Sequence, residues 1–389
     1  MPLKKLFCLP SARSAMYYCA VQFKDLAILD RSTFGHALYN YGHLTRLATR
    51  FEGSNAFSTH LTQAEIIFGD DTRFFTAVGE LAESGSYRGV FVLPNAIGGV
   101  LGKDLSAMAE EAEKKFNLPV FTVDAHQDAN FMDGQQLFYM NMFKKMAGSN
   151  QLKKEYTYNL LCAGPFDCFA AADAAYIKKL LYKKLGLVCN FDLSQVISVW
   201  DWKDFGRAGL NIVCSDAGVK LAVEAQQQCG IPYLRFYPLG ENMESDGLSE
   251  IAAFFGIPFR RRQDARFAEV CREFGNILSV FKTKIICFAT ADKLRALRSF
   301  LQLFDVDAEY WCPYFTTGFK TVNEDECLSF CKGNDVLFIG FDRLAKQFSH
   351  AISLEKSGLD YHLQIPFRIP FVGKTGAYRL MQMIVDGLI

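Results

Sequence analysis

The sequence has no excess of charge of either sign, because 42 Lys and Arg residues balance 42 Asp and Glu residues. Without a basic excess there is no electrostatic indication of nucleic-acid binding, and no long charged run indicates a disordered tail. No apolar stretch approaches the roughly 20 residues that a membrane-spanning helix needs. We therefore expect neither a nucleic-acid partner nor a membrane partner.

The twelve cysteines never form a Cys-x-x-Cys pair, which excludes zinc ribbons and ferredoxin-type cluster motifs. The first ten residues, Met1–Pro10, contain two lysines, but their apolar run is too short for a signal peptide. We therefore expect a cytoplasmic protein. In that compartment cysteines are thiols or metal ligands and not disulfides.

Nucleotide-binding motifs are also missing. Gly98–Lys103 is similar to a phosphate-binding loop, but Ile97 stands where that motif needs a glycine. Asp104 takes the place of the Ser or Thr that would follow the lysine. No Gly-x-Gly-x-x-Gly follows a predicted strand, so we expect this chain to bind no nucleotide.

The pattern that is present is typical of an α/β protein. Half of the 389 residues are hydrophobic, enough for two or three domains that each bury a core. Apolar strands without polar alternation indicate parallel sheets covered by helices on both faces. The predicted strands are Val90–Leu93, Val120–Val123, Asn159–Ala163, Val196–Val199, Leu210–Cys214, Lys284–Ala289, Glu309–Cys312 and Val336–Gly340. The predicted helices are Leu105–Phe116, Ala171–Leu185, Val219–Gln228, Ala291–Leu303 and Glu324–Cys331.

Two polar connections, at 147–156 and 260–266, divide this pattern. They predict three domains, each a Rossmann-like unit with a mainly parallel sheet. The first domain spans residues 1–150 and lies on the subunit-interface side. The second spans 151–265 and carries Cys214, and the third spans 266–389 and ends in a helix.

Cys214 is the most informative single residue. It follows the apolar run Leu210–Val213, and Ser215 and Asp216 offer an N-cap to the next helix. Open α/β sheets bind ligands at the carboxyl ends of their strands. The positive end of the following helix also favours a thiolate, the form that binds metal. Cys214 is therefore either a soft-metal ligand or a buried core thiol.

Several separated stretches carry a family resemblance: Phe57–Gly69, Val90–Leu105, Ala170–Asn190, Ala208–Gly230, Ile231–Gly240, Ala291-Asp292 with Leu297–Phe304, and Gly373–Asp386. In this order and spacing the chain resembles component 1 of nitrogenase and its relatives. Those relatives include cofactor-assembly scaffolds and light-independent protochlorophyllide reductase. The resemblance implies three α/β domains with metal clusters held between domains and between paired subunits.

The resemblance also implies partners and a cofactor. Members of this family usually form heterotetramers and receive electrons from an ATP-dependent iron-sulfur reductase. We therefore expect a second component 1-type subunit, a reductase partner, and assembly as a heterotetramer or homodimer. The implied ligand is an iron-sulfur or other iron-containing cluster, or a tetrapyrrole-like substrate, in an inter-domain cleft.

The family's three interface-cluster cysteines are absent here. The matching positions hold His36, Asn95-Ala96 and Ala125, and alanine supplies no ligand. Either this subunit holds no interface cluster, or the partner supplies three thiolates and His36 adds the fourth ligand. In a further alternative, His36 only forms a hydrogen bond within its turn.

The family's active-site cluster is held by one cysteine and one histidine. Cys214 matches the cysteine, and His362, eleven residues before Gly373, is the candidate histidine. His362 is alternatively a surface-loop residue. The sequence thus predicts a subunit of a nitrogenase-like reductase complex, with a non-catalytic scaffold that has lost its cluster as the alternative.

Overall fold

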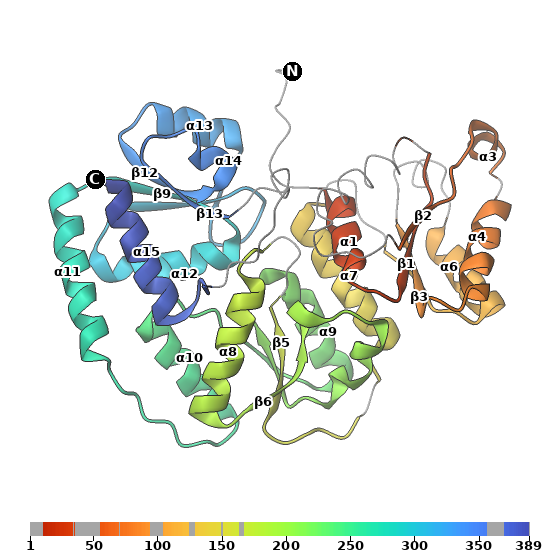
Figure 1. Ribbon diagram of the computed structural model, residues 1–389, viewed down its shortest axis with the longest axis horizontal. Coiled ribbons are helices and arrows are strands. Elements are labelled where there is room, and N and C mark those ends of the chain that lie inside the picture. The colour runs from red at the N-terminus through yellow and green to blue at the C-terminus, as the bar shows by residue number, and fades with distance from the viewer. Residues whose placement is uncertain are drawn as a thin grey trace.

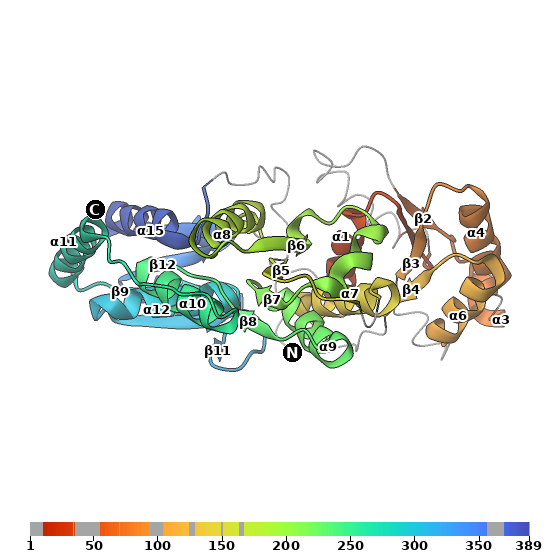
Figure 2. The same ribbon diagram turned by 90° about the horizontal axis from the view of Figure 1, so that it is seen from below.

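The computed structural model of the chain describes residues 11–33, 35, 55–69, 71–93, 104–123, 129–148, 151–162, 167–355 and 369–388. In this part of the chain it forms three β-sheets with helices on their faces (Figure 1). Seen from below, the three units lie side by side in a flat molecule (Figure 2). All described strand pairs are parallel. The predicted α/β fold with mainly parallel sheets is confirmed.

The first sheet has the strand order β2-β1-β3-β4. Its strands are β1 (Leu26–Asp30), β2 (Ala56–Ser58), β3 (Gly89–Leu93) and β4 (Val120–Thr122). The helices of this unit are α1 (Ala12–Val21), α3 (Gln63–Phe68), α4 (Thr72–Glu83), α6 (Leu105–Phe116) and α7 (Phe131–Met146). Apolar residues of α4 and α6 pack on one face of the sheet, and those of α1 and α7 pack on the other.

The second sheet has the strand order β6-β5-β7-β8. Its strands are β5 (Thr157–Leu161), β6 (Val188–Asp192), β7 (Leu210–Val213) and β8 (Tyr233–Arg235). The α-helices are α8 (Ala170–Leu185), α9 (Val219–Cys229) and α10 (Glu241–Phe254), and the 3₁₀ helices are η2 (Leu193–Gln195), η3 (Val199–Arg207) and η4 (Asp216–Gly218). Residues of α8 and α10 pack on one face, and those of α9 and α7 pack on the other.

The third sheet has the strand order β11-β10-β9-β12-β13. Its strands are β9 (Lys284–Phe288), β10 (Ala308–Cys312), β11 (Lys320–Thr321), β12 (Val336–Phe341) and β13 (Ala351–Glu355). Its helices are α11 (Ala265–Phe281), α12 (Ala291–Leu301), η5 (Gln302–Phe304), α13 (Glu324–Lys332), α14 (Asp342–Ala345) and α15 (Gly373–Leu388). Residues of α12 and α15 pack on one face, and those of α13 and α14 on the other.

The prediction of a strand at Val196–Val199 is wrong. Ser198 instead caps the 3₁₀ helix η3, where its side chain accepts a hydrogen bond from the amide of Trp200. Val196, Val199, Trp202 and Phe205 are buried at every third position, which is the period of a 3₁₀ helix. The apolar run therefore lines one side of a helix and does not pair as a strand.

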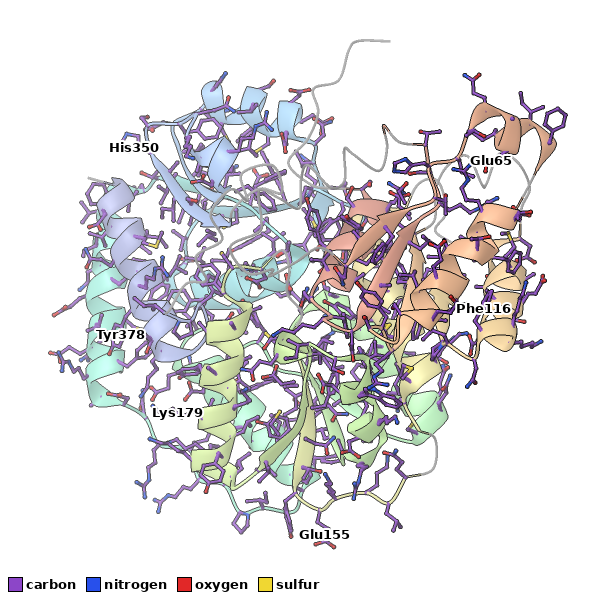
Figure 3. All side chains as sticks on the ribbon, turned by 45° about the vertical axis from the view of Figure 1, so that its right-hand side comes forward. Glu65, Phe116, Glu155, Lys179, His350 and Tyr378 are labelled. Atoms are coloured by element: carbon purple, nitrogen blue, oxygen red, sulfur yellow. The ribbon has the colours of Figure 1, made fainter. Side chains whose placement is uncertain are left out.

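Charged side chains lie mostly at the outside of the three units. Figure 3 shows Lys179 and Glu155 pointing away from the second unit, and both are exposed. Among the described helices, none combines the length and apolar character needed to cross a membrane. Among the described residues, the exceptions to this outward placement include Asp30 and Arg31 at the end of β1 and several buried charges between the second and third sheets.

Candidate functional site

The carboxyl ends of the second and third sheets are joined by ion pairs. The Nζ atom of Lys293, in the first turn of α12 after β9, lies 2.9 Å from Oδ2 of Asp167, which precedes α8. Arg295, also on α12, pairs with Asp216, which follows β7. Ligands of parallel α/β sheets bind at such strand ends. We call Asp167, Asp216, Lys293 and Arg295 with their immediate neighbours the sheet-end site.

Lys293 is a buried cation. Its side chain is only 2% exposed, and its Nζ atom lies 5.6 Å from the centre of the Phe169 ring. Burial opposes the ionisation of neighbouring Asp292, but Lys293 and the hydroxyl of Thr290 outweigh it and lower the pKa of Asp292. The site therefore places a fixed positive charge among buried carboxylates.

Asp216 connects all three units. Its Oδ1 atom accepts a hydrogen bond from Arg235 of β8 at 2.7 Å and another from Arg295. Its backbone carbonyl accepts a hydrogen bond from Nε2 of Gln136 on α7, also at 2.7 Å. Burial and the nearby Asp292 raise the pKa of Asp216, while the two guanidinium groups oppose this. The loop that begins at Cys214 is therefore held from three sides.

Asp173 is completely buried on α8. Its Oδ1 atom accepts hydrogen bonds from the backbone amides of Phe371, at 2.7 Å, and Val372, at 3.2 Å. Its Oδ2 atom accepts one from the Tyr237 hydroxyl at 2.8 Å. Burial and the charge of Asp167 raise the pKa of Asp173 to about 7, against the hydrogen bond from Tyr237 and the charge of Lys293. This carboxyl group therefore exchanges a proton near neutral pH.

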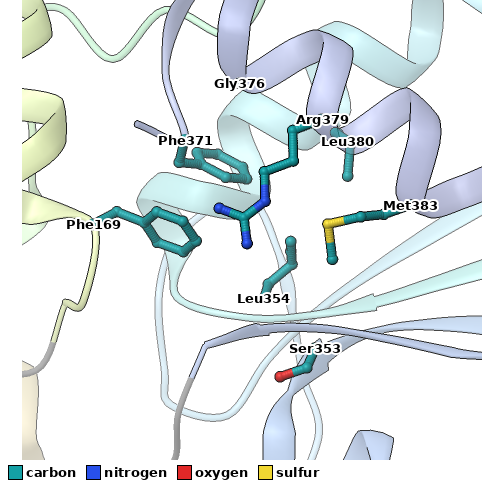
Figure 4. Close-up of a pocket in the computed structure, with 8 residues that line it drawn as sticks. All are labelled: Phe169, Ser353, Leu354, Phe371, Gly376, Arg379, Leu380 and Met383. Atoms are coloured by element: carbon teal, nitrogen blue, oxygen red, sulfur yellow. The ribbon is translucent and has the colours of Figure 1, made fainter. Parts of the chain in front are cut away.

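A small hollow adjoins the sheet-end site, and its volume of about 260 Å³ includes space that is open to solvent. It is lined by Phe169, Ser353, Leu354, Phe371, Gly376, Arg379, Leu380 and Met383. Figure 4 shows the guanidinium of Arg379 extending from α15 toward Phe169. The Cζ atom of Arg379 lies 5.6 Å from the centre of the Phe169 ring. Among the described lining residues, Arg379 adds a positive charge to a mainly apolar lining, and the enclosed space has room for about one water molecule.

Cys214 lies where the sequence predicts it, directly after a buried strand, and it is 2% exposed. It continues the inward-facing row of Leu210 and Ile212, in the same buried cluster as Cys162 and Val372. A hydrogen bond with Cys214, followed by burial, raises the pKa of the Cys162 thiol well above its ordinary value. Here Cys214 is packed as a core thiol, and its role as a ligand stays a prediction.

The other two predicted ligands, His36 and His362, lie outside the described residues. Within the described ranges, no group of three or more His, Cys, Asp or Glu side chains is arranged to hold a metal ion. The described side chains therefore do not fit a metal cluster by themselves. A cluster bound at Cys214 would need ligands from the remaining segments or from a partner.

The sequence did not predict the charged part of this site. The run Thr290–Lys293 directly after a buried strand was a usable signal, because charges that follow such strands lie at the carboxyl edge of the sheet. Asp167 and Asp173 offered no comparable signal. Asp173 finds its backbone partners 198 and 199 residues further along the chain.

Comparison with known proteins confirms the family resemblance. A family model described as nitrogenase component 1 type oxidoreductase matches residues 11–327. The chain is 26% identical over 205 residues to the nitrogenase iron-molybdenum cofactor biosynthesis protein NifE of Methanococcus maripaludis, covering 52% of this chain and 42% of that protein. It is 22% identical over 320 residues to the nitrogenase molybdenum-iron protein alpha chain of Clostridium pasteurianum, covering 78% of this chain and 58% of that one.

The chain spans about half the length of these relatives. Among solved structures, nitrogenase Cp1 at pH 6.5 superimposes with a TM-score of 0.75 at 16% identity. That superposition covers 100% of this chain and 94% of the other. The solved structure therefore shares the fold described above.

Proposed function

Because this chain belongs to the nitrogenase component 1 type oxidoreductase family, we propose that it is a cofactor-binding subunit of a cytoplasmic reductase complex. Its ligand is a metal cofactor or cluster, or a tetrapyrrole-like substrate, bound between the second and third units. The observation that carries this proposal is the sheet-end site, where the strand ends of two sheets meet beside Cys214 and the Phe169–Arg379 pocket.

The residues proposed to reach the ligand are Cys214 and His362. Cys214 follows the strand end, and His362 belongs to the segment between β13 and α15. His36 is proposed as a single ligand to a cluster at the interface with a second component 1-type subunit. Such a subunit and an ATP-dependent iron-sulfur reductase are the proposed partners, in a heterotetramer or homodimer. ATP is assigned to the reductase because this sequence contains no nucleotide-binding motif.

The structure supports a definite division of tasks among this chain's own residues. Lys293 and Arg379 each place a positive charge 5.6 Å from the centre of the Phe169 ring. Positive groups in a site shielded from water attract an anionic ligand more strongly than the same groups at the surface. Asp173 holds a proton near neutral pH, and Asp216 fixes the loop that carries Cys214.

The test is the iron content of the complex, purified anaerobically with its partner. We expect iron in the wild-type complex, its loss in Cys214→Ala, and its retention in Cys287→Ala. Cys287 is a matched control because it is a fully buried thiol within β9. A complex without metal, whose activity is the same with Cys214→Ala, would contradict the proposal.

The burial of Cys214 among apolar side chains favours a second candidate, a non-catalytic scaffold or partner subunit. The missing interface cysteines agree with this alternative. A scaffold should co-purify with a cysteine-bearing homologue. Cys214→Ala would then leave the activity of the complex unchanged, whereas omission of the whole chain would abolish it.

A further inference from the structure

Two thiols lie next to each other at the carboxyl edge of the second sheet. Leu161 of β5 and Val213 of β7 are partners in the parallel ladder, so Cys162 and Cys214 are the next pair along these strands. The ladder continues to this pair, because the amide of Cys214 donates to the carbonyl of Leu161 at 3.1 Å. Cys214 therefore has a second thiol opposite it.

Both thiols lie on the same face of the sheet. Side chains alternate between the two faces along a strand, and both cysteines belong to the buried cluster that contains Leu160 and Ile212, two positions before them. The thiols of Cys162 and Cys214 are hydrogen-bonded to each other. The Cys162 thiol also donates to the carbonyl of Ala170 at 3.4 Å. These contacts hold the two sulfur atoms close together.

The spacing of this pair suits a disulfide. Neighbouring strands lie about 4.8 Å apart, so the Cα atoms of two paired residues are separated by about this distance. A disulfide joins cysteines whose Cα atoms are about 4.4–6.8 Å apart and whose Cβ atoms do not point apart. Cys162 and Cys214 meet both conditions.

A second pair of cysteines shows what a difference in register does. Cys287 of β9 and Cys312 of β10 also lie on neighbouring parallel strands, and both are fully buried. Cys287 is paired with Tyr310, so Cys312 is two residues out of register. This displacement separates the two Cα atoms by roughly 8 Å, which is too far for a disulfide. The chain therefore contains its own matched control.

We propose that Cys162 and Cys214 are a redox pair that closes to a disulfide between β5 and β7 in the presence of a peroxide and reopens with a dithiol reductant. A reversible disulfide of this kind agrees with a reducing compartment, where disulfides are transient and redox-sensing. The disulfide itself does not depend on the ligand of the site. One consequence does rest on the proposed function: a disulfide removes the Cys214 thiolate from the ligands available to a metal.

The oxidation balances with hydrogen peroxide as the acceptor of two electrons. The Cys214 sulfur attacks one peroxide oxygen, the O–O bond breaks, and the departing hydroxide leaves as water with the thiol proton. The Cys162 sulfur then attacks the sulfur of the resulting sulfenic acid. The S–S bond forms, the S–O bond breaks, and the hydroxide leaves as a second water with the proton of Cys162. A dithiol reductant reverses the reaction by two exchange steps and becomes a disulfide itself.

The order of the two steps follows from the surroundings of Cys162. The hydrogen bond with Cys214 and burial raise the pKa of the Cys162 thiol, so Cys162 keeps its proton and Cys214 is assigned the first attack. Burial also slows the reaction, because the thiolate is the attacking form and each side chain is only 2% exposed. The test therefore needs a small oxidant and enough time for the product to reach a constant yield.

Peptide mapping of the full-length chain tests the proposal. The chain is purified without oxygen and treated with a chelator, so that bound iron does not occupy Cys214. Hydrogen peroxide is added under native conditions until the yield of linked peptides is constant, and the remaining thiols are alkylated before digestion. Mass spectrometry then quantifies the peptide that links Cys162 to Cys214 and the peptide that links Cys287 to Cys312.

We expect the Cys162–Cys214 linkage to exceed the Cys287–Cys312 linkage at least about tenfold, and to disappear with dithiothreitol. Cys162→Ala removes the second thiol, so Cys214 should advance to the sulfinic acid. Cys287→Ala is the control variant and should leave the yield of the Cys162–Cys214 disulfide unchanged. The two yields in the wild type keep the test valid if Cys162→Ala does not fold.

Three results would overturn the proposal. One is a wild-type chain that contains no peptide linking Cys162 to Cys214 after oxidation is complete. Another is an equal yield of the Cys287–Cys312 linkage, since that would report unfolding of the chain and not the register of the strands. The third is oxidation of Cys214 to the sulfinic acid at the same rate in the wild type and in Cys162→Ala.

Discussion

Replacement of Lys293 by methionine tests whether a buried cation holds the second and third sheets together. Methionine retains most of the apolar stem and removes the charge. The side chain of Asp167 is 16% exposed, and Asp173 and Asp292 are 0% and 8% exposed. Removing one partner of a buried pair leaves uncompensated charge, so Lys293→Met should lower the free energy of unfolding by about 3–5 kcal/mol.

Urea unfolding followed by circular dichroism measures this loss. With a slope of about 3 kcal/mol per molar urea, the transition that involves the third unit should move down by roughly 1–1.7 M. Lys332→Met is the matched control, because Lys332 is exposed on α13, and its effect should stay within about 0.5 kcal/mol.

A double variant separates the ion pair from simple packing. Lys293→Met combined with Asp167→Asn removes both charges, so it should regain about 2 kcal/mol relative to Lys293→Met alone. The reasoning is refuted if Lys293→Met unfolds at the same urea concentration as the wild type. It is also refuted if the double variant is no more stable than the single one.

Two further substitutions probe the surroundings of the site. Gly376→Ala should destabilise the protein by more than about 2 kcal/mol, because the added Cβ would overlap the backbone carbonyl of Phe371. Thermal unfolding measures this loss. Gly333→Ala is the control, because a Cβ at Gly333 would have no neighbouring atom closer than 3.6 Å. Asp216→Asn should lower the free energy of unfolding by only about 1–2 kcal/mol, because the side chains of Arg235 and Arg295 are 47% and 37% exposed and can return to water. Asp204→Asn is the control in the same urea assay and should be neutral, because the Asp204 side chain is 60% exposed. Equal losses of stability in the two variants would contradict this reasoning.

The central strands were predictable from sequence because burial on both faces removes polar alternation. β3, β5, β7, β9, β10 and β12 all lie within or beside predicted runs. Of the six strands that were not predicted, β2, β6, β8, β11 and β13 lie at sheet edges, and only β1 is internal. Edge strands such as β6, with the sequence Val-Cys-Asn-Phe-Asp, mix polar and apolar residues and lack the signal.

Part of the site was predictable for a similar reason. The change from an apolar run to Ser215 and Asp216 correctly placed Cys214 at a strand end. That Cys214 shares a buried cluster with Val372 was not predictable, because the two residues lie 158 positions apart in the sequence. The pairing of Lys293 with Asp167 likewise depends on how two sheets are set against each other, and local pattern contains no information about that.

The hydrogen bonds that Phe371 and Val372 donate to Asp173 also constrain the order in which the chain reaches its native state. Asp173 bonds amides 198 and 199 residues later, so the carboxyl group waits, during synthesis, until residue 372 has been made. At about 5–20 residues per second that interval is roughly 10–40 s. The second unit completes its interior only after the third has been synthesised, and the nascent second unit should need protection from aggregation until then.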